Sequence, residues 1–153
     1  MPILEVPWRS PLAVAEAVKD IIKGKTVCEL ECACGDLMKE MQKYTMDIIG
    51  MELNSDMVLA AKARGLEIIK GNVFTDQIPD ADIYYIWCDG SMIKNIPNIM
   101  KIGTWIIASD PSEGEDTEIT KLGLEGYWIE VPYNEGELWR QKGTFRLFVT
   151  EKK

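Results

Sequence analysis

A mostly parallel α/β sheet covered by helices on both faces, a three-layer α/β/α sandwich, is the fold class that the sequence predicts. Short apolar runs alternate with segments of helical periodicity along most of the 153 residues, which is typical of strands joined by helices. The end of the chain differs, because residues 127–132 and 144–150 alternate apolar and polar side chains. This alternation favours an antiparallel pair at one edge of a seven-stranded sheet.

The first half of the chain predicts three helices, each followed by a strand. Ser10 and Pro11 are a typical N-cap and first-turn pair, and Gly24 ends the helix that they begin. Asn54 or Ser55 caps the third helix in the same way. The expected helices are 10–24, 36–44 and 54–65, and the expected strands are 26–30, 47–52 and 66–70.

The second half begins with the most strongly β-forming run of the chain, Ile83-Tyr84-Tyr85-Ile86-Trp87. The helix after it is weak, because Pro97 interrupts its pattern. The expected strands are 82–88, 104–108, 127–132 and 144–150, and the expected helices are 91–101 and 117–124.

Length and composition predict one domain over residues 1–153, with an N-terminal arm and helix (1–24) and a sheet core (25–153). A chain of 153 residues with 46% hydrophobic content forms one substantial core and is short for two. It carries no export signal and no long apolar run, so we expect a cytoplasmic protein that does not enter a membrane.

Charge and residue types limit the partners and the kinds of chemistry that the chain can have. The net charge of -8 argues against nucleic acid as a partner and favours a small molecule or a protein. Histidine is absent, which excludes His-dependent nucleophilic triads and His-ligated metals. Acid-base chemistry therefore falls to carboxylates, Lys, Tyr or Cys.

The turn after the first strand is the main candidate site. It reads Glu29-Leu30-Glu31-Cys32-Ala33-Cys34-Gly35-Asp36-Leu37, at the carboxyl end of that strand, where parallel sheets bind ligands. Glu52 ends the next strand 17 residues after Gly35, near the spacing at which an acid meets ribose hydroxyls in nucleotide-binding folds.

These segments resemble the class I, Rossmann-like S-adenosylmethionine-dependent methyltransferases over nearly the whole chain. Val27-Cys28-Glu29-Leu30 resembles the family's first strand and its acid, and Ile49-Gly50-Met51-Glu52-Leu53-Asn54 resembles its second strand and ribose-binding acid. Gly71-Asn72-Val73 stands where the family contacts adenine, and the closing strand pair matches the family's antiparallel seventh strand.

The resemblance implies a site for S-adenosylmethionine. Glu29 would orient the turn and the cofactor's amino group, and Glu52 would hold the ribose. Asn72 would contact the adenine amino group, and the backbone of Val73 would contact the ring edge. The residues expected to bind the cofactor are Glu29, Glu31, Cys32, Ala33, Gly35, Glu52, Leu53, Asn72, Val73 and Cys88.

The turn departs from the family's Gly-x-Gly-x-Gly, because Glu31 and Ala33 replace two of the glycines and Gly35 alone remains. Glycine serves there because it adopts positive φ and lets a ligand approach closely. Glu31 places a carboxylate near the expected methionine carboxylate, and like charges oppose binding. A register shifted by two residues gives Glu31 the role of the acid. It would leave Glu29 inside a buried strand, so we prefer the first register.

The segment after the fourth strand, residues 87–91, is where the family places groups that face the methyl acceptor. It lacks the Asn/Asp-Pro-Pro-aromatic and Pro-Cys patterns of base methylation. Asp89 is the candidate catalytic residue, to orient a nucleophile or accept its proton, although Asp-Gly is equally typical of a turn. We therefore expect a protein side chain or a small molecule as the acceptor.

Two alternatives follow from the same residues. The chain could keep the fold without activity and serve as a partner or regulatory subunit, because the glycines of the turn are lost. Cys32, Cys34 and Cys88 could instead converge as a metal or redox site, since the first and fourth strands are neighbours in this fold. The second alternative lacks a Cys-x-x-Cys pair and a fourth ligand.

Overall fold

The computed structural model describes residues 10–87, 95, 99, 101–110, 119–133 and 143–152. Cys88 and Asp89 of the expected site lie outside these residues. Of the expected helix 91–101, positions 95, 99 and 101 fall within them, and the first two are helical.

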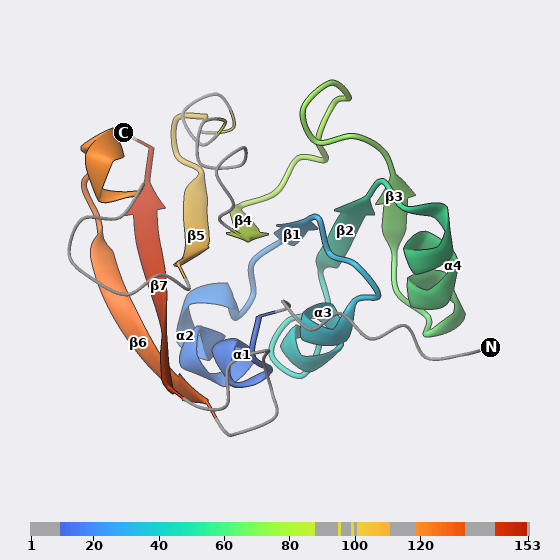
Figure 1. Cartoon of the computed structure of the whole chain (residues 1–153), viewed down its shortest axis with the longest axis horizontal. Helices are drawn as coiled ribbons and strands as arrows, with labels where there is room; N and C mark the ends of the chain where they lie inside the picture. The colour runs from blue at the N-terminus through green and yellow to red at the C-terminus, as the bar shows by residue number, and fades with distance from the viewer. Residues whose placement is uncertain are drawn as a thin grey trace.

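Seven strands form one sheet, as the sequence predicts, and their order is β3-β2-β1-β4-β5-β7-β6 (Figure 1). β1 to β5 are mutually parallel, whereas β7 pairs antiparallel with both β5 and β6. The strands are β1 (Val27–Leu30), β2 (Ile48–Glu52), β3 (Ile68–Lys70), β4 (Ile83–Trp87), β5 (Trp105–Asp110), β6 (Tyr127–Tyr133) and β7 (Gly143–Glu151). The strand order reverses between β1 and β4, which is where such sheets bind ligands.

The helices of the first half lie together on one face of the sheet (Figure 1). They are α1 (Ala13–Ala17), α2 (Lys19–Ile22), α3 (Asp36–Met41) and α4 (Ser55–Ala63), and a 3-10 turn, η1 (Thr120–Leu122), precedes β6. The expected cap of α4 is confirmed, because the Asn54 side chain accepts hydrogen bonds from the backbone of Asp56 and Met57. Gly65, at φ 80°, follows the end of α4.

Both faces of the sheet are buried, and β4 shows this residue by residue. Ile83 and Tyr85 belong to the apolar cluster that includes the helices α1 to α4, whereas Tyr84 and Ile86 belong to a second cluster on the other side. A strand buried on both faces explains the continuous apolar run that predicted it.

The expected helix over 10–24 is interrupted, and its expected cap is wrong. Val18, at φ -106° and ψ 7°, separates α1 from α2, and Leu12 rather than Ser10 precedes α1. The Ser10 hydroxyl is instead hydrogen-bonded to the Tyr85 hydroxyl at 2.5 Å. The local pattern predicts that the Ser10 hydroxyl caps the helix, but this hydroxyl bonds to a buried side chain 75 residues away.

Among the helices that the structure describes, none is long and apolar enough to cross a membrane.

Candidate functional site

The turn after β1 keeps a glycine-like backbone without its glycines. Glu31 has φ 57° and Ala33 has φ 53°, and Gly35 has φ 81°. This left-handed region is costly for residues with a Cβ. The three positions coincide with the register preferred from the sequence, in which residues 31, 33 and 35 stand for the three glycines.

The Glu52 carboxylate holds this turn against the end of β2. Its Oε1 accepts a hydrogen bond from the Ala33 backbone N–H at 2.9 Å, and its Oε2 accepts one from the Asn54 N–H at 2.9 Å. The Cys32 N–H adds a backbone bond to the Met51 carbonyl at 3.2 Å. A carboxylate has about four lone-pair sites, so Glu52 retains acceptor capacity toward a ligand.

Glu29 is the most buried acid of the site. Its side chain is 7% exposed, and its Oε2 has no hydrogen-bond partner among the residues that the structure describes. Burial, followed by the charges of Asp36 and Glu52, raises the pKa of Glu29 well above its ordinary value. A buried carboxyl oxygen without a partner is costly unless a ligand supplies one.

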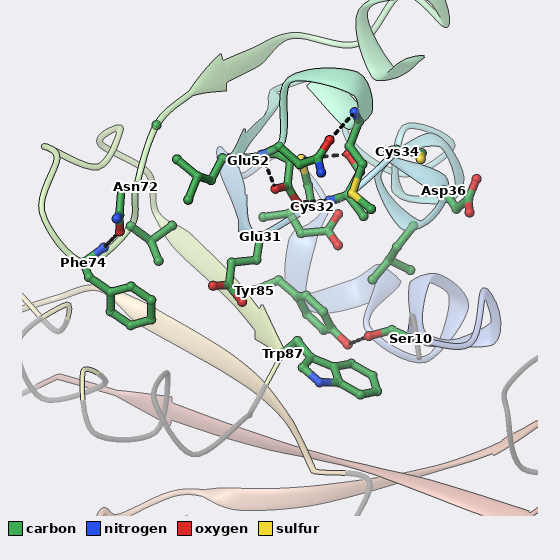
Figure 2. A pocket seen from close by; sticks show the side chains of 18 residues that line it. Ser10, Glu31, Cys32, Cys34, Asp36, Glu52, Asn72, Phe74, Tyr85 and Trp87 are labelled. Carbon is green, nitrogen blue, oxygen red and sulfur yellow. Dashed lines mark hydrogen bonds between the residues drawn. The ribbon is translucent and has the colours of Figure 1, made fainter. Parts of the chain in front are cut away.

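A cavity of about 800 Å³ opens where these residues meet (Figure 2). Eight of the ten residues expected to bind the cofactor line it, namely Glu29, Glu31, Cys32, Ala33, Glu52, Leu53, Asn72 and Val73. Gly35 does not line it, and Cys88 lies outside the described residues. A Cβ on Gly35 would come within 2.2 Å of Leu66 Cδ1, and the φ of 81° at this position favours glycine.

Asn72 shapes the wall of the cavity at the end of β3. Its Oδ1 accepts a hydrogen bond from the Phe74 N–H at 2.9 Å, and its N–H donates to Asp76 Oδ2 at 2.7 Å. These bonds form a compact turn of the Asx type. Val73 and Phe74 belong to this turn and line the cavity, as Figure 2 shows for Phe74.

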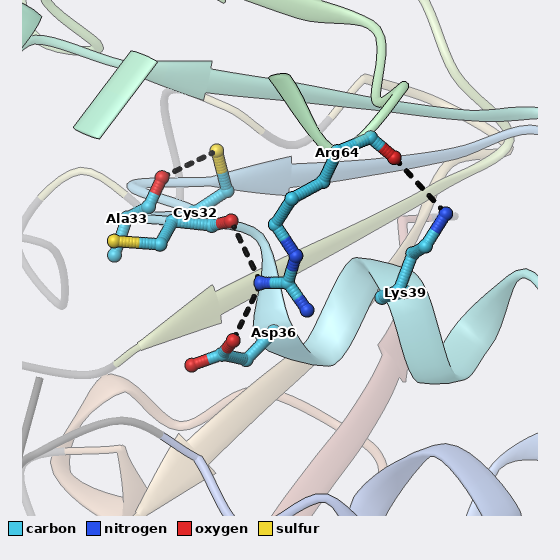
Figure 3. A network of polar contacts seen from close by, with 6 residues as sticks. Cys32, Ala33, Asp36, Lys39 and Arg64 are labelled. Carbon is cyan, nitrogen blue, oxygen red and sulfur yellow. Dashed lines mark hydrogen bonds and ion pairs between the residues drawn. The ribbon is translucent and has the colours of Figure 1, made fainter. Parts of the chain in front are cut away.

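Arg64 fixes the far side of the turn to the end of α4 (Figure 3). Its Nη1 donates to the Cys34 carbonyl at 3.1 Å and to Asp36 Oδ1 at 2.6 Å, while its own carbonyl accepts from Lys39 Nζ at 3.0 Å. No local pattern in the sequence predicts this contact, because 28 residues separate Arg64 from Asp36.

The wall that β4 and the N-terminal segment build was not among the residues expected to bind the cofactor. Tyr85 and Trp87 line the cavity from β4, and Ser10 reaches it through its bond to Tyr85. Alternation along β4 was the available signal, since it places residues 85 and 87 on one face. The other lining residues that were not predicted are Cys34, Asp36, Leu37, Asn54, Met57, Gly71 and Phe74.

The cysteines of this region are buried thiols. Burial, with a smaller contribution from Glu29, raises the pKa of Cys28 to about 12, and burial raises the pKa of Cys32 and of Cys34 as well. High pKa values oppose the thiolate form that metal binding and redox chemistry need. Among the described residues, no group of three or more His, Cys, Asp or Glu side chains is arranged to hold a metal ion.

The lining of the cavity therefore combines acids with apolar side chains. A carboxylate at a strand end suits a pair of hydroxyls, a buried acid suits a cation, and Phe74 and Trp87 suit a flat apolar group. An adenosyl ligand with a positively charged tail has all of these features.

Comparison with known proteins identifies the fold by structural similarity and not by sequence similarity. No protein-family model matches the chain, and no curated protein matches it by sequence. Among solved structures, the N-methyltransferase NodS from Bradyrhizobium japonicum WM9 has a TM-score of 0.68 at 10% identity, over 93% of this chain and 94% of that one. The fold is that of the class I S-adenosylmethionine-dependent methyltransferases.

Two further structures with this fold cover the chain as fully. The RNA methyltransferase from Salinibacter ruber, solved in complex with S-adenosyl-L-homocysteine, has a TM-score of 0.64 at 15% identity, over 95% of this chain and 94% of that one. Precorrin-6y C5,15-methyltransferase from Geobacter metallireducens GS-15 has a TM-score of 0.62 at 15% identity, over 93% of this chain and 86% of that one. The acceptors named for these proteins belong to different chemical classes.

Proposed function

We propose that the chain binds S-adenosylmethionine in the cavity at the ends of β1, β2 and β4 and transfers its methyl group to a small molecule or a protein side chain. The observation that carries the proposal is the backbone of the turn at Glu31 and Ala33. Non-glycine residues held in the left-handed region cost about 1–3 kcal/mol each and cluster at ligand sites. Two such residues within three positions indicate a turn whose shape is kept for binding.

Each part of the cofactor has a counterpart in the cavity. Glu52 would accept hydrogen bonds from the ribose hydroxyls, and Asn72 with the Val73 backbone would meet the adenine edge. The unpartnered Oε2 of Glu29 would receive the cofactor's ammonium group, which fits the buried acid to a cation.

Bound S-adenosylmethionine supplies a methyl group on a sulfonium, a leaving group that needs no protonation. The work of the chain is therefore to position the methyl group in line with a nucleophile and to exclude water. Trp87, at the end of β4, lines the cavity on the acceptor side. Asp89, two residues further along the chain, is the proposed group that orients the nucleophile and takes its proton.

The class of acceptor is proposed from charge. With a net charge of -8, the chain is poorly suited to a phosphate backbone and better suited to a basic protein or a metabolite. The fold itself is compatible with nucleic acid, as the RNA methyltransferase from Salinibacter ruber illustrates. A structured RNA therefore belongs in the acceptor screen.

A second candidate function is that of an inactive partner or regulatory subunit. The observation that favours it is Glu31, whose carboxylate lies in the cavity where the family has a glycine. If Glu31 blocks the cofactor, the fold would act through its surface alone.

Calorimetric titration with S-adenosylmethionine tests the proposal. The native chain should bind with a dissociation constant in the micromolar range, about 8 kcal/mol, and Glu52→Ala should bind at least tenfold more weakly. Glu67→Ala is the matched control, because it also removes one glutamate, exposed and outside the cavity, and should bind as the native chain does. Bound protein would then be screened with basic proteins, metabolites and RNA for release of S-adenosylhomocysteine.

The outcomes separate the two candidate functions. Binding that is lost in Glu52→Ala and kept in Glu67→Ala supports a cofactor site. No binding by the native chain, with binding restored in Glu31→Gly, would refute the proposal and favour the partner or regulatory subunit.

A further inference from the structure

The charged residues seen to line the cavity are acidic. Among the lining residues that the structure describes, Glu29, Glu31, Asp36 and Glu52 are acidic, and none is Lys or Arg. They come from the end of β1, the start of α3 and the end of β2. Walls of low dielectric concentrate such a field inside the cavity.

The four acids differ in how far the protein offsets their charge. Asp36 is paired with Arg64 at 2.6 Å, so its charge is largely compensated. Glu52 bonds to two backbone N–H groups, which are neutral and leave its charge in place. Glu52 thus presents its negative charge to a ligand in the cavity.

Glu29 indicates that a ligand binds in this cavity. Its side chain is more than nine-tenths buried and lines the cavity, and its Oε2 lacks a hydrogen-bond partner among the described residues. A ligand with a hydrogen-bond donor would supply the partner that this buried carboxyl oxygen lacks. A cationic donor would form a stronger hydrogen bond than a neutral one.

Glu31 adds a charge that the turn does not need for its shape. Glycine is the residue that adopts φ 57° without strain, yet the chain carries a carboxylate there. Figure 2 shows the Glu31 side chain reaching away from the turn and into the cavity.

We infer that the cavity selects its nucleoside by net positive charge and that Glu31 sets this selectivity. The inference rests on the proposed function, because it takes the ligand to be an adenosyl compound. S-adenosylhomocysteine carries no net charge, S-adenosylmethionine carries one positive charge, and decarboxylated S-adenosylmethionine carries two. The affinity should rise in that order, so that the cavity releases the neutral thioether and prefers an amine without a carboxylate.

The size of the effect follows from Coulomb attraction. A unit charge several ångströms from a carboxylate, at the effective dielectric of a partly open site, changes the affinity by about tenfold. We expect about tenfold between successive members of the series. Neutralising Glu31 should reduce each step to about threefold, since the charge of Glu52 remains.

The test is a calorimetric titration of the three nucleosides into the native chain, Glu31→Gln and Glu67→Gln. Glu31→Gln removes the charge and keeps the size of the side chain. Glu67→Gln makes the same change in net charge at an exposed position outside the cavity. Glu31→Gly serves as a second variant that relieves the strained φ, and thermal melts establish that each variant is folded.

The expected result is the order given above in the native chain and in Glu67→Gln, with a compressed series in Glu31→Gln and Glu31→Gly. Equal affinity for S-adenosylmethionine and S-adenosylhomocysteine in the native chain would overturn the inference while leaving the proposed function standing. An unchanged series in both Glu31 variants would overturn the role of Glu31. Failure of all three nucleosides to bind the native chain would overturn the proposed function, and the inference with it.

Discussion

Glu52 and Ala33 are joined by a hydrogen bond of 2.9 Å from the Ala33 N–H to Glu52 Oε1, and this bond ties the turn after β1 to the end of β2. The other oxygen of Glu52 accepts the Asn54 N–H, one residue before α4 begins. One carboxylate therefore fixes three segments that line the cavity. Glu52 therefore stabilises the turn in the ligand-free protein.

Glu52→Gln should therefore destabilise the ligand-free protein. An amide offers one acceptor oxygen, so one of the two backbone N–H groups would face an NH₂ group instead. Losing a hydrogen bond to a charged group costs about 1.5–3 kcal/mol, and we expect a loss in this range from urea denaturation. The same measurement on Glu67→Gln should show a change below about 0.5 kcal/mol, as at other exposed sites. Equal stability of both variants would mean that Glu52 does not hold the turn.

Glu29 should make stability depend on pH. Because burial raises its pKa in the folded state, the folded protein keeps a proton that the unfolded chain has released. The contribution of the protonated Glu29 to the free energy of unfolding is full below the ordinary glutamate pKa, and it is lost as the pH rises through the pKa of Glu29 in the folded state. Glu29→Gln should remove this loss, so the variant should gain stability relative to the native chain over the pH range above the ordinary glutamate pKa.

Urea denaturation of both proteins across that range measures the gain. A constant difference at every pH would show that Glu29 is already ionised in the folded, ligand-free protein.

Gly50 should not tolerate a side chain in the middle of β2. A Cβ there would lie 2.6 Å from Cys32 Sγ and 2.6 Å from Met38 Sδ. Overpacking of this kind costs about 1–3 kcal/mol, so Gly50→Ala should be destabilised by that amount. Adding Cys32→Ala should recover part of the loss, which a double-mutant cycle would measure as coupling. Purely additive effects would argue against the close contact of Gly50 with Cys32.

Ala33 should resist β-branched replacement because of its backbone. At φ 53°, valine is more strained than alanine, and we expect Ala33→Val to cost about 2 kcal/mol in thermal or urea unfolding. Ala17→Val is the control, since Ala17 is exposed in α1 and the change there costs about 0.5 kcal/mol of helix propensity. Similar costs at the two positions would contradict the left-handed conformation of Ala33.

Much of the fold is predictable because its signals are local. The doubly buried run in β4, the Asn54 cap of α4 and the alternation in β6 and β7 each follow from neighbouring residues. The expected Ser10 cap failed because a distant hydroxyl, that of Tyr85, competes for the same side chain.

The candidate site likewise contains residues that the sequence predicts and residues that it does not. Glu52 was predicted from its spacing after Gly35, and Glu29 and Asn72 were expected from the resemblance to the methyltransferase family. All three line the cavity because the ends of parallel strands coincide. Arg64 was not predicted, because its contact with the turn depends on how the end of α4 packs against residues 34–36. The left-handed backbone at residue 31 follows only from the resemblance, in which this position stands for a glycine, since glutamate by itself does not predict that conformation.

Backbone amide NMR of the ¹⁵N-labelled protein, titrated with S-adenosylmethionine, tests the central claim most directly. A cofactor in this cavity should shift the amides of residues 29–35, 52–54 and 72–74 together and with one dissociation constant, while the amides of β6 and β7 stay in place. No shifts, or shifts confined to β6 and β7, would contradict a cofactor site at the turn after β1.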